Sequence, residues 1–188
     1  MDANAPPAQL RRLDAEAIDA AAAALGALLA AAVAEGASLG FLAGLTPEQA
    51  TRHWRDLAAS AQDSAVIVAE DAEGVAGVVV VQPLHAAFQA HRAQVAKLIV
   101  HRRARARGIG AALMRAAEDE ARRMSRPVLT LMTRHGSASE RLYRALGWTL
   151  AGVIPHDSLA PDGTPVDGAI WVRRLDAARP DAGGRGRR

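Results

Sequence analysis

The sequence predicts a single mixed α+β domain, in which one layer of sheet carries helices packed against it. The length of 188 residues suits one domain with a sizeable core, and no linker divides the chain. Strand-like and helix-like segments alternate along the chain instead of forming separate blocks. Half of the residues are hydrophobic but only 3% are aromatic, so we expect an aliphatic core.

The N-terminal half predicts a strand, two helices and a hairpin. Asp14 is placed to cap the first helix, and Thr46 followed by Pro47 is a typical start for the second. Two valine-rich runs on either side of the turn letters DAEG predict the hairpin. In order, we expect a strand at 8–15, a helix after Asp14, a glycine-rich loop at 35–45, a helix from Thr46, and paired strands at 64–70 and 75–83.

The C-terminal half predicts four strands and two helices. Ser137 and Glu140 have the spacing of a capping box, and Gly147 marks the end of the helix that they start. In order, we expect a strand at 92–102, a helix at 110–124, a strand at 127–133, a helix at 137–148, and closing strands at 149–155 and 168–175 around a turn at 161–163.

Composition excludes several kinds of site. The chain has no cysteine, which rules out disulfides, thiolate metal sites and a cysteine nucleophile, and it agrees with a cytoplasmic location. No histidine and carboxylate spacing predicts a metal site. The uncharged stretch 20–34 is too short and alanine-rich for a membrane span, so we interpret it as a helix of a soluble domain.

The charge distribution argues against a nucleic-acid-binding protein. The formal net charge is only +3, and Lys97 is the one lysine among 23 basic residues. Several positive charges fall in 177–188, which has the composition of a disordered basic tail, whereas the domain at 8–176 is close to neutral. A patch of arginines that binds nucleic acid remains the least favoured of our hypotheses.

The stretch HRRARARGIG, residues 101–110, is the part of the sequence that indicates a binding site for an anion. It lies between a strand and a helix, where unpaired backbone N–H groups and the helix dipole favour an anion. Gly108 and Gly110 allow close backbone approach, and nearby arginines add charge. Neither the dinucleotide fingerprint nor a G-K-[ST] P-loop is present. These residues alone leave two interpretations, a pyrophosphate site or a solvated turn; Arg102 and Arg103 are expected to be solvated in both.

A family resemblance favours the first interpretation. VAKLIVHRRARARGIGAALM resembles the acetyl-CoA-binding segment of the GNAT superfamily of N-acetyltransferases, whose pattern [Q/R]-x-x-G-x-[G/A] falls on Arg105, Gly108 and Gly110. ERLYRALGW resembles the second recognisable segment of that superfamily, and the resemblance spans roughly residues 9 to 175. The chain is closer still to acetyltransferases of the tabtoxin-resistance type.

The resemblance implies a mostly antiparallel twisted sheet of six to seven strands with about four helices. A central strand at 94–101 would splay from the next at 127–133, and acetyl-CoA would lie in the gap as the acyl donor, without a metal. Tyr143 matches the tyrosine that many members use as a general acid for the leaving thiolate. Cofactor contacts would come from Tyr143, from backbone groups of Leu98, Ile99 and Val100, and from the N–H groups of Arg105, Ala106, Arg107, Gly108, Ile109, Gly110 and Ala111.

The chain departs from the pattern where a base is expected. Gln94 and Met132 occupy the positions that carry acidic residues in tabtoxin-resistance-type members, and Gly136 replaces a frequent asparagine. An amine with a pKa near 10.4 costs roughly 4–5 kcal/mol to deprotonate at pH 7, so the proton needs an acceptor. His135 is the best-placed substitute, ahead of His91 and His101. Water could also remove the proton.

The resulting prediction is an acetyl-CoA-dependent N-acetyltransferase that acts on a small amine, an amino acid or an amine-bearing antibiotic, with a role in antibiotic resistance. The alternative is a non-catalytic or weakly active acyl-CoA-binding sensor, because Gln94 and Met132 cannot accept a proton. We expect the loops at 35–45 and 155–168 to shape the acceptor site. Lys97 is expected to contact either a cofactor phosphate or a carboxylate. We expect no nucleic acid or membrane partner, and a homodimer is a candidate assembly because superfamily members often dimerise.

Overall fold

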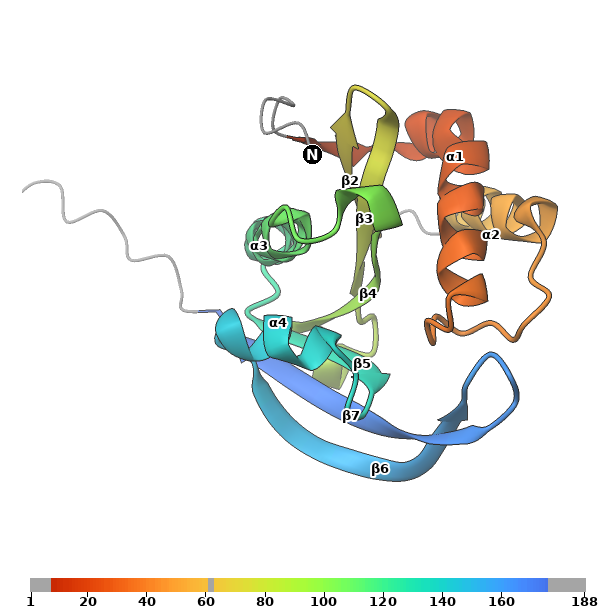
Figure 1. The fold of residues 1–188 in the computed structure, drawn as a ribbon. Coiled ribbons are helices and arrows are strands. Elements are labelled where there is room, and N and C mark those ends of the chain that lie inside the picture. The colour runs from red at the N-terminus through yellow and green to blue at the C-terminus, as the bar shows by residue number, and fades with distance from the viewer. Residues whose placement is uncertain (1–7, 61–62, 176–188) are drawn as a thin grey trace, which may run out of the picture.

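The computed structural model describes residues 8–60 and 63–175, so the tail expected at 177–188 lies outside the described residues. The described residues form a seven-stranded sheet in the order β1-β2-β3-β4-β5-β7-β6, with four α-helices (Figure 1). The predicted mixed α+β fold is confirmed. The elements are β1 (Gln9–Leu13), α1 (Ala15–Ala34), α2 (Pro47–Ser60), β2 (Ala65–Asp71), β3 (Gly74–Pro83), β4 (Arg92–Val100), α3 (Ile109–Arg123), β5 (Val128–Arg134), α4 (Ser139–Ala145), β6 (Thr149–Leu159) and β7 (Pro165–Arg174), with short 3₁₀ turns at Ala87–Gln89 and Arg102–Ala104.

Helices cover both faces of the sheet. In Figure 1, α1 and α2 lie on one side of β2 to β4, and α3 lies on the other. Alternate valines of β2 and β3 serve the two cores: Val66 and Val78 pack with α1, whereas Val79 packs with α3. This alternation follows from the period of two in a strand and explains why both strands are valine-rich throughout.

The first helix belongs to the core. α1 has the length and hydropathy of a membrane span, but half of that window is buried inside the protein. Gly26 lets α2 approach closely, since an added Cβ would lie 2.5 Å from the Thr51 hydroxyl oxygen and 2.7 Å from its backbone nitrogen. A core helix, as the sequence predicts for 20–34, accounts for this packing.

Two of the three predicted helix caps form as expected. The Asp14 side chain accepts a 2.8 Å hydrogen bond from Ala17 N, and Thr46 and Gln49 cap each other reciprocally. The capping box at Ser137 is wrong. The last helix begins at Ser139, and the Ser137 hydroxyl instead contacts the hydroxyls of Thr133 and Ser139.

The closing hairpin is longer than predicted. β6 extends to Leu159 and β7 begins at Pro165, so most of the expected 155–168 loop is strand. The pairing register shifts between Ile154 and Ser158, where His156 has a left-handed φ of 51°. This bulge lets the long hairpin bend, as the curved ribbon of β6 and β7 shows (Figure 1).

The two halves of the sheet separate between β4 and β5. These strands pair in parallel at only three positions, from Arg92 opposite Val128 to Gln94 opposite Thr130. Beyond Gln94 the strands no longer pair, and the other neighbours in the sheet are all antiparallel. The splay expected between 94–101 and 127–133 is therefore present.

Candidate functional site

The turn after β4 has a backbone conformation that needs glycine. Ala106 and Gly108 both have left-handed φ values, 60° and 77°, and α3 begins immediately after Gly108. An added Cβ at Gly108 would meet nothing within 4 Å, so conformation and not space favours glycine there. The turn directs the start of α3 toward the end of β4. The helix begins at Ile109, one residue earlier than the sequence predicts.

This turn presents a row of unpaired donors. Within residues 8–60 and 63–175, no protein acceptor is found for the backbone N–H groups of residues 106–111. Gly108 is the N-cap and supplies no side chain to bond the first turn of α3. The positive end of the helix dipole adds to the six donors. The geometry is suited to a phosphate or pyrophosphate group.

The carboxylate of Asp71 holds the turn from one side. Arg103 Nη1 donates to both carboxylate oxygens of Asp71, at 2.8 and 2.6 Å, and Arg107 lies 3.4 Å from the same carboxylate. The Asp71 side chain is only 6% exposed, and its hydrogen bond with Arg103 lowers the pKa of its carboxyl. The expectation that Arg103 is solvated is wrong, because Asp71 of the β2–β3 hairpin neutralises it; Arg102 is exposed as expected.

Arg105 ties the turn to α1. Its guanidinium contacts Glu35 at 2.5 Å and the backbone oxygen of Val100 at 3.3 Å. The side chain is thus already paired with a carboxylate. Arg105 would therefore assist phosphate binding by holding the turn in position.

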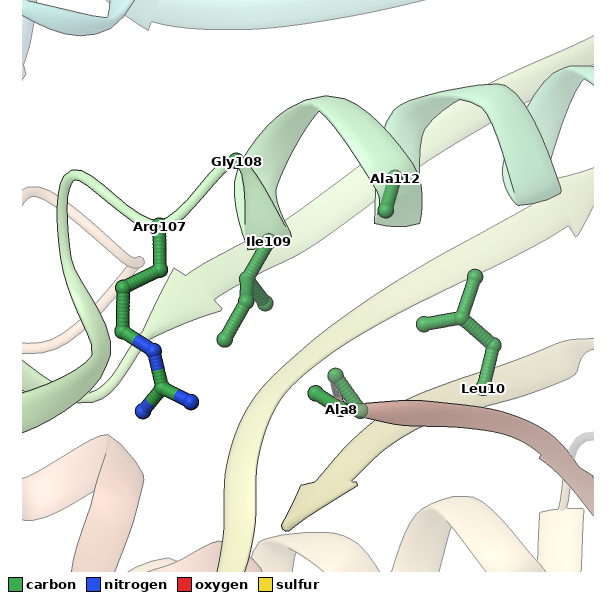
Figure 2. A pocket seen from close by; sticks show the side chains of 7 residues that line it. Ala8, Leu10, Arg107, Gly108, Ile109 and Ala112 are labelled. Carbon is green, nitrogen blue, oxygen red and sulfur yellow. The ribbon is translucent and has the colours of Figure 1, made fainter. Parts of the chain in front are cut away.

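Figure 2 shows a hollow between the start of α3 and the strands β1 and β2. Its volume is about 350 Å³, and the Arg107 guanidinium extends along it beside Gly108 and Ile109. Its other walls come from β1, β2 and the next turn of α3, through Ala8, Leu10, Ala69 and Ala112. It includes no residue of β4 or β5 and is therefore separate from the splay.

The splay exposes backbone groups of β4. The Ile99 carbonyl oxygen points toward Gly77 of β3, where an added Cβ would lie 2.8 Å from it. Because successive residues of a strand point their backbone groups to opposite edges, those of Leu98 and Val100 face the edge that β5 has left. Two of the three predicted contact residues are thus placed for an extended ligand, and Ile99 is not; its side chain is buried against α1.

Tyr143 lies on α4 and is 6% exposed. Its ring packs beside Trp148 and Trp171, with centroids 6.3 and 5.9 Å away. Burial raises the pKa of its hydroxyl, while a hydrogen bond with Ser139 acts in the opposite direction. The phenol therefore stays protonated around neutrality and can act as a proton donor.

His135 and Glu140 form a pair that the sequence did not predict. His135 Nδ1 lies 3.1 Å from Glu140 Oε1, and the same oxygen accepts a hydrogen bond from Gly136 N. The Glu140 side chain is 9% exposed and that of His135 is 42% exposed. A carboxylate on Nδ1 orients the ring and leaves Nε2 free to accept a proton. The spacing of the two residues around the Gly136 turn is the only signal that could have suggested it.

The remaining predicted base positions carry no carboxylate. Gln94, at the last β4–β5 pair, is exposed, and Met132, on β5 beyond that pairing, is 47% exposed. His101 Nδ1 accepts a hydrogen bond from Arg103 N, which engages that ring in the turn. His91 is exposed and precedes β4, at the paired end of the two strands. Within the described ranges, no group of three metal-ligating side chains is found.

The two loops expected to shape an acceptor site meet. Ala43 N donates a 2.7 Å hydrogen bond to the Pro161 carbonyl oxygen, which joins the α1–α2 loop to the β6–β7 turn. Asp162 accepts from Thr164 N and serves the turn itself, while Asp157 packs against Gly168.

A model of the acetyltransferase (GNAT) domain family matches residues 62–150, which contain the splay, the turn and α4. The fold is that of the GNAT superfamily. Similar solved structures include a GCN5-related N-acetyltransferase from Kribbella flavida, with 27% identity, a TM-score of 0.73, and coverage of 90% of this chain and 98% of that one.

Two further structures are similar at lower identity. The ribosomal-protein-alanine N-acetyltransferase of Brucella melitensis is 23% identical, with a TM-score of 0.74 and coverage of 89% and 99%. A GNAT phosphinothricin acetyltransferase from Sinorhizobium meliloti, solved with acetyl-CoA, is 21% identical, with a TM-score of 0.74 and coverage of 94% and 95%. These comparisons support a GNAT acetyltransferase fold for this chain.

Proposed function

We propose that this protein is an acetyl-CoA-dependent N-acetyltransferase that acetylates the amine of a small molecule. The observation that carries the proposal is the row of free N–H groups at 106–111, placed at the end of a strand whose partner has splayed away. The first feature suits the pyrophosphate and the second suits the extended arm of one ligand. The GNAT domain match and the neighbour solved with acetyl-CoA support the same donor.

Two segments of the chain would bind different parts of acetyl-CoA. The N–H groups of residues 106–111 would hold the pyrophosphate. Backbone groups of Leu98 and the Val100 N–H would hold the acetyl-bearing arm, since the Val100 carbonyl oxygen already accepts from Arg105. Because the chain has no cysteine, no acyl-cysteine intermediate can form. The acceptor nitrogen would attack the thioester carbonyl directly, and the C–S bond would then break.

The acceptor ammonium loses two protons as it becomes an amide, one before the attack and one after it, and the leaving thiolate gains one. The second nitrogen proton would restore the tyrosine hydroxyl, so two residues suffice for these transfers. Tyr143 would protonate the leaving thiolate, since burial keeps its hydroxyl protonated. His135, with Nδ1 held by Glu140, would take the proton that the ammonium must lose. This assignment replaces the absent carboxylates at Gln94 and Met132. We further propose that the acceptor is a small amine, an amino acid or an amine-bearing antibiotic, and that the protein works in the cytoplasm.

The test is a thiol-release assay with acetyl-CoA and a broad amine panel between pH 6 and 9, alongside calorimetric titration with acetyl-CoA. Turnover with at least one amine is expected. Binding of acetyl-CoA with no turnover at any pH would contradict the enzymatic proposal. Absence of binding would contradict the whole site.

A second function is favoured by one observation, the side chains of Gln94 and Met132. A protein that binds acyl-CoA as a sensor needs no base, and these side chains provide none. It would bind acetyl-CoA without transfer, and Tyr143→Phe would leave its function unchanged. A nucleic-acid patch is less well supported, because Arg103 and Arg105 are already paired with Asp71 and Glu35.

A further inference from the structure

Lys97 interrupts β4 with an unusual backbone. Its φ is 50°, in the left-handed region that non-glycine residues rarely adopt. The β3–β4 register shifts here, with Val78 opposite Ile99 but Val80 opposite Ala96, so an extra residue bulges from β4. Such conformations cluster at functional sites, where the surrounding structure holds them. The bulge re-aims the lysine side chain away from the regular alternation of the strand.

The bulge brings the ammonium group under the α1–α2 loop. Lys97 Nζ donates a 2.5 Å hydrogen bond to the Leu39 carbonyl oxygen and lies 4.9 Å from the centre of the Phe41 ring. Burial lowers the pKa of the Lys97 ammonium. Across the described residues, no carboxylate forms a salt bridge with Lys97. A protein carboxylate, one of its two expected partners, is therefore not found within residues 8–60 and 63–175.

The Lys97 ammonium and a hydroxyl of the α1–α2 loop both have hydrogen-bonding capacity that the described residues leave unused. An ammonium has three donors, and the Leu39 oxygen uses one. Gly40 leaves space beside it, since an added Cβ would meet only Lys97 Nζ, at 3.6 Å. The hydroxyl of Ser38, in the same loop, is buried without a hydrogen-bond partner. A half-buried cation and an orphaned hydroxyl both favour a ligand with negatively charged oxygens.

The place of Lys97 in the fold connects this feature to the reaction. It lies three residues beyond the last β4–β5 pair, at Gln94, and thus beside the splay. The loop above it is fastened to the β6–β7 turn through Ala43 and Pro161. Lys97 therefore lies between the splay and the two loops expected to shape the acceptor site, on the α1–α2 side of the sheet.

We propose that Lys97 binds the carboxylate of the acceptor, so that the acceptor class is amines that carry a carboxylate, such as free amino acids. This inference rests on the proposed function, since it names the acceptor of that reaction. The same cation would disfavour polyamines and polycationic antibiotics by like-charge repulsion. His53, whose edge faces Phe41, adds no charge at neutral pH, because burial and Lys97 lower the pKa of its imidazole.

The test compares each amino acid of a panel with its amide, which keeps the amine and removes the negative charge. The wild-type protein is expected to acetylate one or more acids with a kcat/KM at least about 10-fold above that of the matching amide. Lys97→Met should lower kcat/KM for the acids by about 10- to 100-fold, mainly through KM, and leave the amides unchanged. Lys97→Arg should retain part of the preference.

The matched control is Arg52→Met, which removes a positive charge from an exposed position of α2 and should preserve the preference. A wild-type protein that prefers amides, or a Lys97→Met variant that lowers acids and amides equally, would overturn the inference. Thermal melting of each variant identifies misfolding, in which case Lys97→Gln replaces Lys97→Met.

The inference can fail separately from the proposed function. If no amine is acetylated, calorimetric titration of the same acids and amides into CoA-saturated protein gives a direct readout. Binding of acids that Lys97→Met abolishes would support the carboxylate site even without transfer. Equal or absent binding of acids and amides would overturn it, whatever the fate of the acetyltransferase activity.

Discussion

Asp71 allows the most specific prediction about the turn at 101–110. Replacing it with alanine removes the acceptor of two Arg103 hydrogen bonds and the anion beside Arg107. It also removes a hydrogen bond from Glu73 N, at 3.0 Å. Arg103 would then keep only its 3.5 Å contacts with Glu73 and the Gly74 carbonyl oxygen, so the turn would be held less firmly to the β2–β3 hairpin.

The size of the effect follows from burial. Breaking a fully buried ion pair costs about 3–5 kcal/mol, whereas exposed pairs contribute about 0–1 kcal/mol. The Asp71 side chain is 6% exposed and that of Arg103 is 22% exposed, so the pair lies between these limits. We expect Asp71→Ala to lower the free energy of unfolding by about 2 kcal/mol and the melting temperature by roughly 4–8 °C.

The same carboxylate predicts a pH dependence. Arg103 lowers the folded-state pKa of Asp71 below its ordinary value of 3.8. A carboxyl with a depressed pKa contributes its stability fully above the unfolded pKa and loses it as the pH falls through the folded pKa. The difference in melting temperature between wild type and variant should be constant from pH 7 to 5 and shrink below 3.8.

Thermal unfolding at several pH values, with acetyl-CoA titration at pH 7, tests this reasoning. The matched control is Asp119→Ala, which breaks an exposed pair with Arg122 in α3 and should change stability by less than about 0.5 kcal/mol. Asp71→Ala should weaken acetyl-CoA binding, because the N–H row is held less firmly in place. Equal effects of the two substitutions on stability would refute the argument.

Three further predictions concern the site itself. Tyr143→Phe should lower kcat by about 10²-fold or more and leave the acetyl-CoA dissociation constant unchanged, as measured by thiol release and calorimetry; the wild-type rate should show no loss from tyrosine ionisation up to pH 9, because burial raises the pKa of the hydroxyl. Glu140→Gln should lower kcat/KM by about 10-fold or more, because the His135 ring loses its ionic partner, and an unchanged value would mean that His135 is not the base. Gly108→Ala and Gly74→Ala should each cost about 1–2 kcal/mol through their left-handed backbones, but only the former should weaken acetyl-CoA binding in the same titration.

The elements of the fold could be predicted because their patterns are local. The valine-rich hairpin, the Asp14 and Thr46 caps and the glycine after α4 each depend on a few neighbouring residues. The Ser137 cap failed because Thr133, on the preceding strand, competes for the same hydroxyl. The extent of β6 and β7 was missed for a related reason: their pairing passes through a bulge at His156 that interrupts the alternation.

The ion pairs of the site could not be predicted, because they join residues far apart in the chain. Arg103 and Asp71 are 32 positions apart, and Arg105 and Glu35 are 70 apart. Arginines in a turn are usually solvated, and only the packing of the β2–β3 hairpin against the turn changes that expectation. Lys97 shows the converse: its position in a strand was apparent, but the bulge that aims it at the α1–α2 loop depends on the β3–β4 register.

These pairings change how the arginine-rich stretch recognises an anion. Asp71 and Glu35 neutralise Arg103 and Arg105. The strongest fixed donors at the turn are therefore backbone N–H groups at the N-terminal end of α3. Such donors have fixed directions, so at the proposed site they would select the shape of a pyrophosphate and not negative charge in general. Lys97 has no carboxylate partner among the residues that the structure describes. The proposed pyrophosphate site and the proposed carboxylate site would thus differ in kind along one strand. This difference suits a donor and an acceptor that both carry negative charge and must each bind at its own site.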